Sequence, residues 1–117
     1  MNYNIIPTEY FAKVAKPLAK KYPSFKADLG TLINDLAKQP MTGIDLGGGF
    51  RKIRMAITSK NKGKSGGARV ITYTVMISLQ NTDVFLVTIY DKGEKENIPV
   101  HELQKIVNNE MNLFKNQ

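Results

Sequence analysis

The sequence predicts an α+β fold, a small twisted and mainly antiparallel sheet with an N-terminal helical hairpin and a C-terminal helix. Apolar residues recur with a period of about 3.6 before Pro40 and again after Pro99, which indicates helices in both regions. Between Phe50 and Tyr90 the pattern is instead that of three strands. A chain of 117 residues is one domain on length alone. We therefore predict a single domain over residues 1–117, in the order strand, two helices, three strands, helix.

The N-terminal part predicts one strand and two helices. Tyr3–Ile6 is a short apolar run, typical of a strand, and Pro7 closes it because proline cannot donate a ladder hydrogen bond. Thr8 and Ser24 are suitable N-caps for the two helices. Pro17 lies inside the first helix, where an interior proline costs about 3 kcal/mol, so a kink or a break is expected there. The apolar residues of each helix share one face: Phe11, Val14, Ala15 and Leu18, then Phe25, Leu29, Leu32, Ile33 and Leu36.

The C-terminal part predicts three strands and a helix. Met41–Gly49 is turn-rich and ends in three glycines, which let the backbone enter the first strand sharply. In that strand apolar side chains alternate with Lys52 and Arg54, so an apolar face and a cationic face are expected. Arg69–Ile77 and Val84–Tyr90 are the next two strands. All helices are expected on one side of the sheet, with an open basic face on the other.

The net charge is concentrated in one segment, residues 50–69. Seven basic residues lie in it, and no acidic residue occurs between Asp45 and Asp83. The other ten of the 17 basic residues balance the ten acidic ones, so this segment accounts for the net charge of +7. Such a single-sign cluster predicts contact with a polyanion. The seven residues are Arg51, Lys52, Arg54, Lys60, Lys62, Lys64 and Arg69.

Several of these cations are expected to meet on one face of the sheet. Tyr90 and Lys92 share a parity, and if the strands pair in sequence their face is that of Lys52 and Arg54. Cations on this face can stabilise charge that develops on a phosphate oxygen, and a tyrosine can stack on an unpaired base. The loop at 59–67 would lie at the rim, too basic to pack and mobile without a ligand. This arrangement favours single-stranded RNA over a duplex.

Four segments carry a family resemblance: YNIIPTEYF, KKYPSFKADL, FRKIRMAITSKNKGKSGGARVITY and LVTIYDKGEKENI. They resemble the RelE/ParE superfamily of toxins, and within it the HigB-like branch of type II toxin-antitoxin modules. The resemblance implies a RelE-like fold and a cytoplasmic mRNA interferase that cuts message in the ribosomal A site. It implies attack of a 2'-hydroxyl on the adjacent phosphate, without metal or cofactor. The implied partners are the ribosome, mRNA and a cognate antitoxin, expected to contain a helix-turn-helix.

The resemblance also implies roles for single residues. Arg54 and Arg69 would stabilise charge on the phosphate, and Lys52 is the candidate base. Tyr90 and Lys92 would be the base-stacking and proton-donating groups at the end of the last strand. The remaining basic residues of the segment are expected to bind RNA or the ribosome: Arg51, Lys60, Lys62 and Lys64.

The composition excludes several other kinds of site. Cys is absent, so a disulfide, a thiolate nucleophile and a Cys-based zinc site are impossible. The single histidine, His101, cannot supply the acid and base pair of a histidine ribonuclease, and no structural metal is expected. The N-terminus lacks the pattern of a signal peptide and no apolar stretch is long enough to span a membrane, so we expect a cytoplasmic protein.

Alternative interpretations remain open from the sequence. The loop lysines are also compatible with solubilising charge, and Tyr90 with a residue that merely covers the sheet. A ParE-like, non-enzymatic inhibitor of DNA gyrase would share the same superfamily. A module that binds RNA or the ribosome without chemistry would share the same cationic surface.

Overall fold

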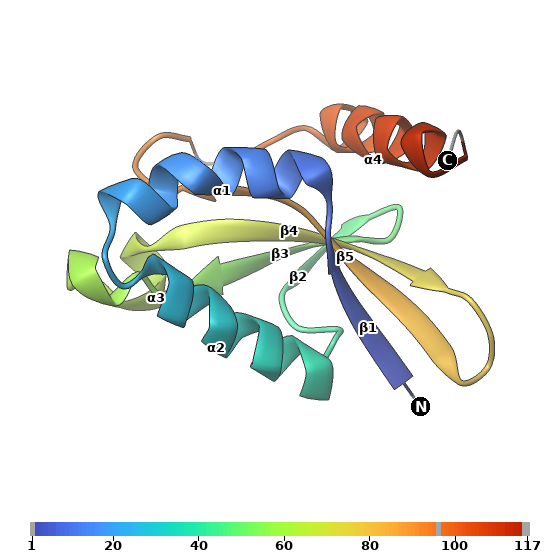
Figure 1. Ribbon diagram of the computed structural model, residues 1–117, viewed down its shortest axis with the longest axis horizontal. Coiled ribbons are helices and arrows are strands. Elements are labelled where there is room, and N and C mark those ends of the chain that lie inside the picture. The colour runs from blue at the N-terminus through green and yellow to red at the C-terminus, as the bar shows by residue number, and fades with distance from the viewer. Residues whose placement is uncertain (1, 96, 116–117) are drawn as a thin grey trace.

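A mixed sheet of five strands forms the centre of the molecule, in the order β1-β5-β4-β3-β2 (Figure 1). The structure, a computed structural model, describes residues 2–95 and 97–115. The strands are β1 (Asn2–Pro7), β2 (Ile44–Gly47), β3 (Phe50–Met55), β4 (Ala68–Met76) and β5 (Asn81–Asp91). The helices are α1 (Glu9–Lys21), α2 (Phe25–Lys38), the single turn α3 (Gly63–Gly66) and α4 (Val100–Lys115), with a 3-10 turn η1 at Thr58–Lys60.

The strand directions confirm the predicted class. The pairs β2–β3, β3–β4 and β4–β5 are antiparallel, whereas β1 pairs parallel with β5, from Asn2 opposite Asn81 to Pro7 opposite Leu86. β1 lies at the edge of the sheet, where a proline that lacks an N–H can end a strand without breaking a ladder on both sides. The fold is therefore α+β with a mainly antiparallel sheet, as predicted.

The helical hairpin confirms one predicted N-cap and corrects two other expectations. The Thr8 hydroxyl accepts a hydrogen bond from the Phe11 N–H at 3.0 Å, so it caps α1. Ser24 occupies the N-cap position of α2 without capping it, because its hydroxyl instead donates to the Asp28 carboxylate at 2.8 Å. Of the kink or break predicted at Pro17, the break is wrong, since α1 runs through this residue, and the kink stays a prediction. Pro17 faces solvent, so water can satisfy the carbonyl that lost its donor, while burial of Leu18 holds the helix on the sheet.

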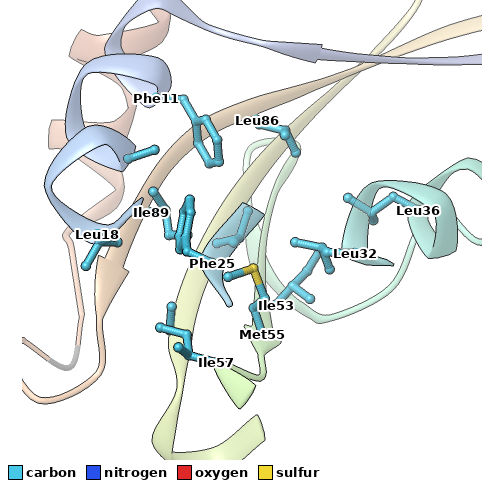
Figure 2. Close-up of a cluster of buried hydrophobic side chains, with 13 residues drawn as sticks. Phe11, Leu18, Phe25, Leu32, Leu36, Ile53, Met55, Ile57, Leu86 and Ile89 are labelled. Carbon is cyan, nitrogen blue, oxygen red and sulfur yellow. The ribbon is translucent and has the colours of Figure 1, made fainter. Parts of the chain in front are cut away.

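The larger core cluster lies between the helical hairpin and the sheet. Figure 2 shows its side chains converging from α1, α2, β3 and β5. On β3, Ile53 and Met55 point into this cluster, which confirms the predicted apolar face. The buried members labelled there are Phe11, Leu18, Phe25, Leu32, Leu36, Ile53, Met55, Ile57, Leu86 and Ile89.

The opposite face of the sheet is only partly open, which corrects the prediction that all helices lie on one side. Leu103 and Val107 of α4 pack on this face, against Phe50, Ile71 and other apolar residues of the sheet. β5 is buried along almost its whole length, and a strand that is apolar on both faces needs a cover on each. α4 therefore covers this face over β4 and β5 and leaves its cationic part, beside β3, uncovered.

Two segments predicted as irregular contain regular structure. β2 forms inside the turn-rich Met41–Gly49 and pairs antiparallel with β3. Gly47, Gly48 and Gly49 have φ values of +87°, +63° and +90°, and this left-handed backbone makes the tight turn between the two strands. The basic loop after β3 holds η1 and α3, so it is not the irregular segment that the sequence predicts.

Candidate functional site

Strand register brings the predicted site residues into one row across three strands. Arg54 on β3 lies opposite Arg69 on β4, and Arg69 lies opposite Tyr90 on β5. Two residues away along the strands, Ile71 on β4 lies between Lys52 on β3 and Thr88 on β5. A β-bulge between Ile71 and Thr72 shifts the register beyond this point and leaves both rows intact. The predicted shared face of Lys52, Arg54 and Tyr90 is therefore confirmed.

An open groove of about 600 Å³ lies over this part of the sheet. Five basic residues line it, from β3, the basic loop, β4 and the segment after β5. None of the described residues that line it is an Asp or Glu. The remaining walls come from the segment that enters β2 and from Asn97 before α4. The basic residues are Lys52, Arg54, Lys64, Arg69 and Lys92.

The groove concentrates positive charge where walls of low dielectric strengthen it. Clefts lined by one sign of charge focus the electrostatic field and raise the local concentration of ions of opposite sign. Lysine and arginine side chains differ in what they offer: arginine presents a planar fork that matches a phosphate, and lysine presents a compact point charge. The groove holds both types within one sheet face, so it can hold a phosphodiester backbone by several contacts at once.

Comparison with known protein families assigns the chain to a family. A family model described as the RelE toxin of the RelE/RelB toxin-antitoxin system matches residues 4–116, almost the whole length. The chain belongs to the RelE toxin family. Membership of a toxin-antitoxin system implies an antitoxin as the partner of this RelE-family toxin.

Arg54 and Lys52 are the cations of β3 that line the groove of the toxin. Arg54 is exposed, and within the described part of the chain it makes no hydrogen bond or ion pair, so its guanidinium is available to a ligand. Lys52 is half-buried, and its ammonium donates to the side-chain oxygen of Asn97 at 2.8 Å. Asn97 thus fixes the direction of Lys52 from across the groove. Asn97 could not be predicted from the sequence, because a single asparagine before a helix has no distinctive pattern.

Arg69 has a second role that the sequence did not predict. Its side chain is buried, with 7% exposed, and donates to the backbone carbonyls of Lys64 at 3.2 Å and Ser65 at 3.0 Å. These bonds tie the basic loop to β4. Arginine carries five N–H donors, so contacts to the loop leave others for the groove, which Arg69 also lines.

Tyr90 does not line the groove in the toxin but borders a separate pocket, together with Thr88 and Lys95. It is only 4% exposed and packs in the α4-side cluster with Leu103 and Val107. Burial raises the pKa of its hydroxyl, and the positive charge of Arg69 partly opposes this. The phenol therefore stays protonated at neutral pH. Stacking of an RNA base on this ring stays a prediction that its burial does not favour.

The other predicted RNA-binding residues divide between the groove and elsewhere. Lys64 lines the groove, whereas Lys62 is exposed on the loop outside the groove lining. Arg51 points to the face of β3 opposite Lys52, and its guanidinium lies 3.7 Å from the carboxylate of Asp45. Their binding of RNA stays a prediction, and the structure gives only Lys64 a place beside the site.

Lys60 corrects the expectation that the loop is too basic to pack. Its ammonium lies 2.8 Å from the Asp91 carboxylate and 5.5 Å from the centre of the Tyr22 ring, and 13% of its side chain is exposed. A buried carboxylate and an aromatic face together compensate for the loss of water around the charge. Asp91 could not be predicted as this partner, because it lies on a strand far from Lys60 in sequence.

Metal-binding clusters and membrane-spanning helices are both absent from the part of the chain that the structure describes. No group of three or more His, Cys, Asp or Glu side chains in residues 2–95 and 97–115 is arranged to hold a metal ion. Within the same ranges, no helix is long and apolar enough to cross a membrane.

Proposed function

We propose that this toxin is a ribosome-dependent endoribonuclease of the HigB-like branch, which cuts mRNA in the A site and so stops translation in the cytoplasm. The observation that carries the proposal is the groove, in which five cations converge with no carboxylate among the described lining residues. RelE-family toxins are in general endoribonucleases, and this site has the charge that a phosphodiester substrate requires.

The proposed chemistry uses only side chains of the site. Lys52, in its unprotonated form, takes the proton of a ribose 2'-hydroxyl, and the 2'-oxygen attacks the adjacent phosphorus. Arg54 and Arg69 stabilise the negative charge that develops on the phosphate oxygens. The bond to the 5'-oxygen breaks, and Lys92, which lines the groove, gives that oxygen a proton. The products are a 2',3'-cyclic phosphate and a 5'-hydroxyl.

The antitoxin proposed for this groove is acidic where it meets the toxin. A segment rich in Asp and Glu, carried by a protein with a helix-turn-helix, would neutralise the cations and exclude RNA. Lys64, on the basic loop, would contact either ligand.

Primer extension on a reporter message in a purified translation system tests the function. Wild-type protein and the Arg54→Ala variant are compared with and without ribosomes. Arg54 is preferred to Arg69 for this purpose, because Arg69 also holds the loop. Lys38→Ala is the control, since it removes one positive charge from an exposed position at the end of α2.

We expect cuts within codons for the wild type and Lys38→Ala, in the presence of ribosomes only, and none for Arg54→Ala. Ribosome association should change much less than cleavage, because the groove retains four of its cations. An uncut message that is still translated would overturn the proposal, and gyrase supercoiling would then be assayed. Association without cuts by the wild type would instead favour a binding module.

A further inference from the structure

Asp91 at the end of β5 forms a buried polar centre beside the groove. It is 4% exposed, yet its carboxylate has three donors. The Lys60 ammonium donates at 2.8 Å, the Gly93 N–H donates at 2.9 Å, and the Tyr22 hydroxyl also donates to it. A buried carboxylate is stable only when it is paired and hydrogen-bonded in this way.

The three donors come from three separate parts of the chain. Tyr22 follows α1 at the junction with α2, and Lys60 lies in η1 at the start of the basic loop. Gly93 lies in the turn directly after Lys92, one of the groove cations. Asp91 therefore connects the helical hairpin, the basic loop and the segment that carries Lys92.

The basic loop depends on such polar contacts for its position. Neither η1 nor α3 contains a buried residue, so the nearest apolar anchor is Ile57, just before η1. At its start, the Thr58 N–H and hydroxyl donate to the Asp28 carboxylate at 2.8 and 2.6 Å. At its end, the Gly67 carbonyl accepts from the Lys92 N–H at 3.1 Å. Between these points two buried side chains hold the loop: Arg69 donates to the carbonyls of Lys64 and Ser65, and Asp91 pairs with Lys60.

We propose that Asp91 is a positioning residue, which holds Lys92 and the loop that carries Lys64 so that their cations converge on one phosphodiester of the RNA. The inference rests on the proposed function. Asp91 does not line the groove, so it acts through the segments that it joins. Tyr22 and Lys60 belong to the same network, and Lys60 serves the site from within the protein and not by contact with RNA.

Two properties of the carboxylate support this role. Burial acts to raise the pKa of Asp91, but the hydrogen bonds from Lys60, Tyr22 and the Gly93 N–H, with the charge of Lys60, lower it to about 2. The carboxylate therefore stays ionised at neutral pH. Each of its two oxygens also has a different set of donors, since Lys60 and Gly93 meet one and Tyr22 the other. The Asp91 side chain thus has a fixed orientation, and it holds its hydrogen-bond partners in position.

Hydrogen exchange of the free protein tests the positioning without RNA. The variant Asp91→Asn keeps the shape of the side chain and removes the charge. Its matched control is Asp83→Asn, at the other end of the same strand, where the carboxylate accepts from Asn4. We expect the Lys92 amide and the amides of 61–67 to exchange at least about tenfold faster in Asp91→Asn than in the wild type or the control.

Single-turnover cleavage of mRNA on programmed ribosomes tests the consequence for the site. At saturating ribosomes and a temperature at which melting shows every variant folded, Asp91→Asn should cleave about tenfold or more slowly. The ribosome concentration for half-saturation should change less than about threefold, because the groove cations remain. Tyr22→Phe removes one donor from Asp91 and should show smaller changes of the same kind, which keeps the test decisive should Asp91→Asn not fold.

The possible failures are distinct. If the wild-type protein does not cleave mRNA, the proposed function is overturned. The exchange of the loop amides would still decide whether Asp91 holds the loop in position. Unchanged exchange in Asp91→Asn, or faster exchange with an unchanged cleavage rate, overturns the positioning role. Equal losses in Asp83→Asn and Asp91→Asn would also overturn it, because the effect would then be one of general destabilisation.

Discussion

The ionised state of Asp91 predicts a specific loss of stability in acid. The pKa of its carboxyl is lowered from 3.8 to about 2 in the folded protein. One pKa unit corresponds to about 1.4 kcal/mol, so this difference contributes about 2 kcal/mol to the free energy of unfolding. Because the folded pKa is the lower one, the contribution is complete above the unfolded value of 3.8 and is lost as the pH falls toward 2.

Urea unfolding of the wild type and Asp91→Asn between pH 7 and pH 2 measures this contribution. The wild type should be the more stable protein near pH 6. Its advantage should shrink by about 2 kcal/mol between pH 5 and pH 2, because only the wild type has this carboxyl to protonate. Other carboxylates, such as Asp28, titrate in both proteins and leave the difference unchanged. Parallel stability curves across the whole pH range would refute the reasoning.

Two further predictions concern the core and the groove. Leu36→Ala should lower the free energy of unfolding by about 3 kcal/mol, because the Leu36 side chain is 1% exposed. Leu79→Ala, at an 87% exposed position, should change this free energy by less than about 0.5 kcal/mol, and chemical denaturation measures both. Lys64→Ala should weaken RNA binding and reduce the slope of log K against log salt by about 1, and Lys62→Ala should do less; equal effects would contradict the groove as the binding surface.

Local patterns were enough to predict the face on which the site lies. Alternation along β3 places Lys52 and Arg54 opposite Ile53 and Met55 in any register, because the pleat has a period of two. The same reasoning placed Tyr90 on the face of Arg54, and antiparallel pairing of neighbouring strands then aligned them.

Long-range contacts determined what the sequence could not show. Lys60 and Lys64 belong to the same basic loop, yet one meets Asp91 in the interior and the other lines the groove. The difference depends on where β5 ends in space, and no periodicity encodes that position. The break expected at Pro17 was wrong for a similar reason, because burial of Leu18 outweighs the local cost of proline in a helix.

The position of β1 determines when the sheet of the toxin can be completed during synthesis. β1 is the first strand to be synthesised, yet its only partner within the described chain is β5, the last strand. Pairing of this kind must wait until β5 has emerged, since domains with such distant contacts cannot form their sheet early. The groove likewise needs residues from Thr42 to Asn97. The sheet and the groove therefore cannot be completed before β5 and Asn97 have been synthesised.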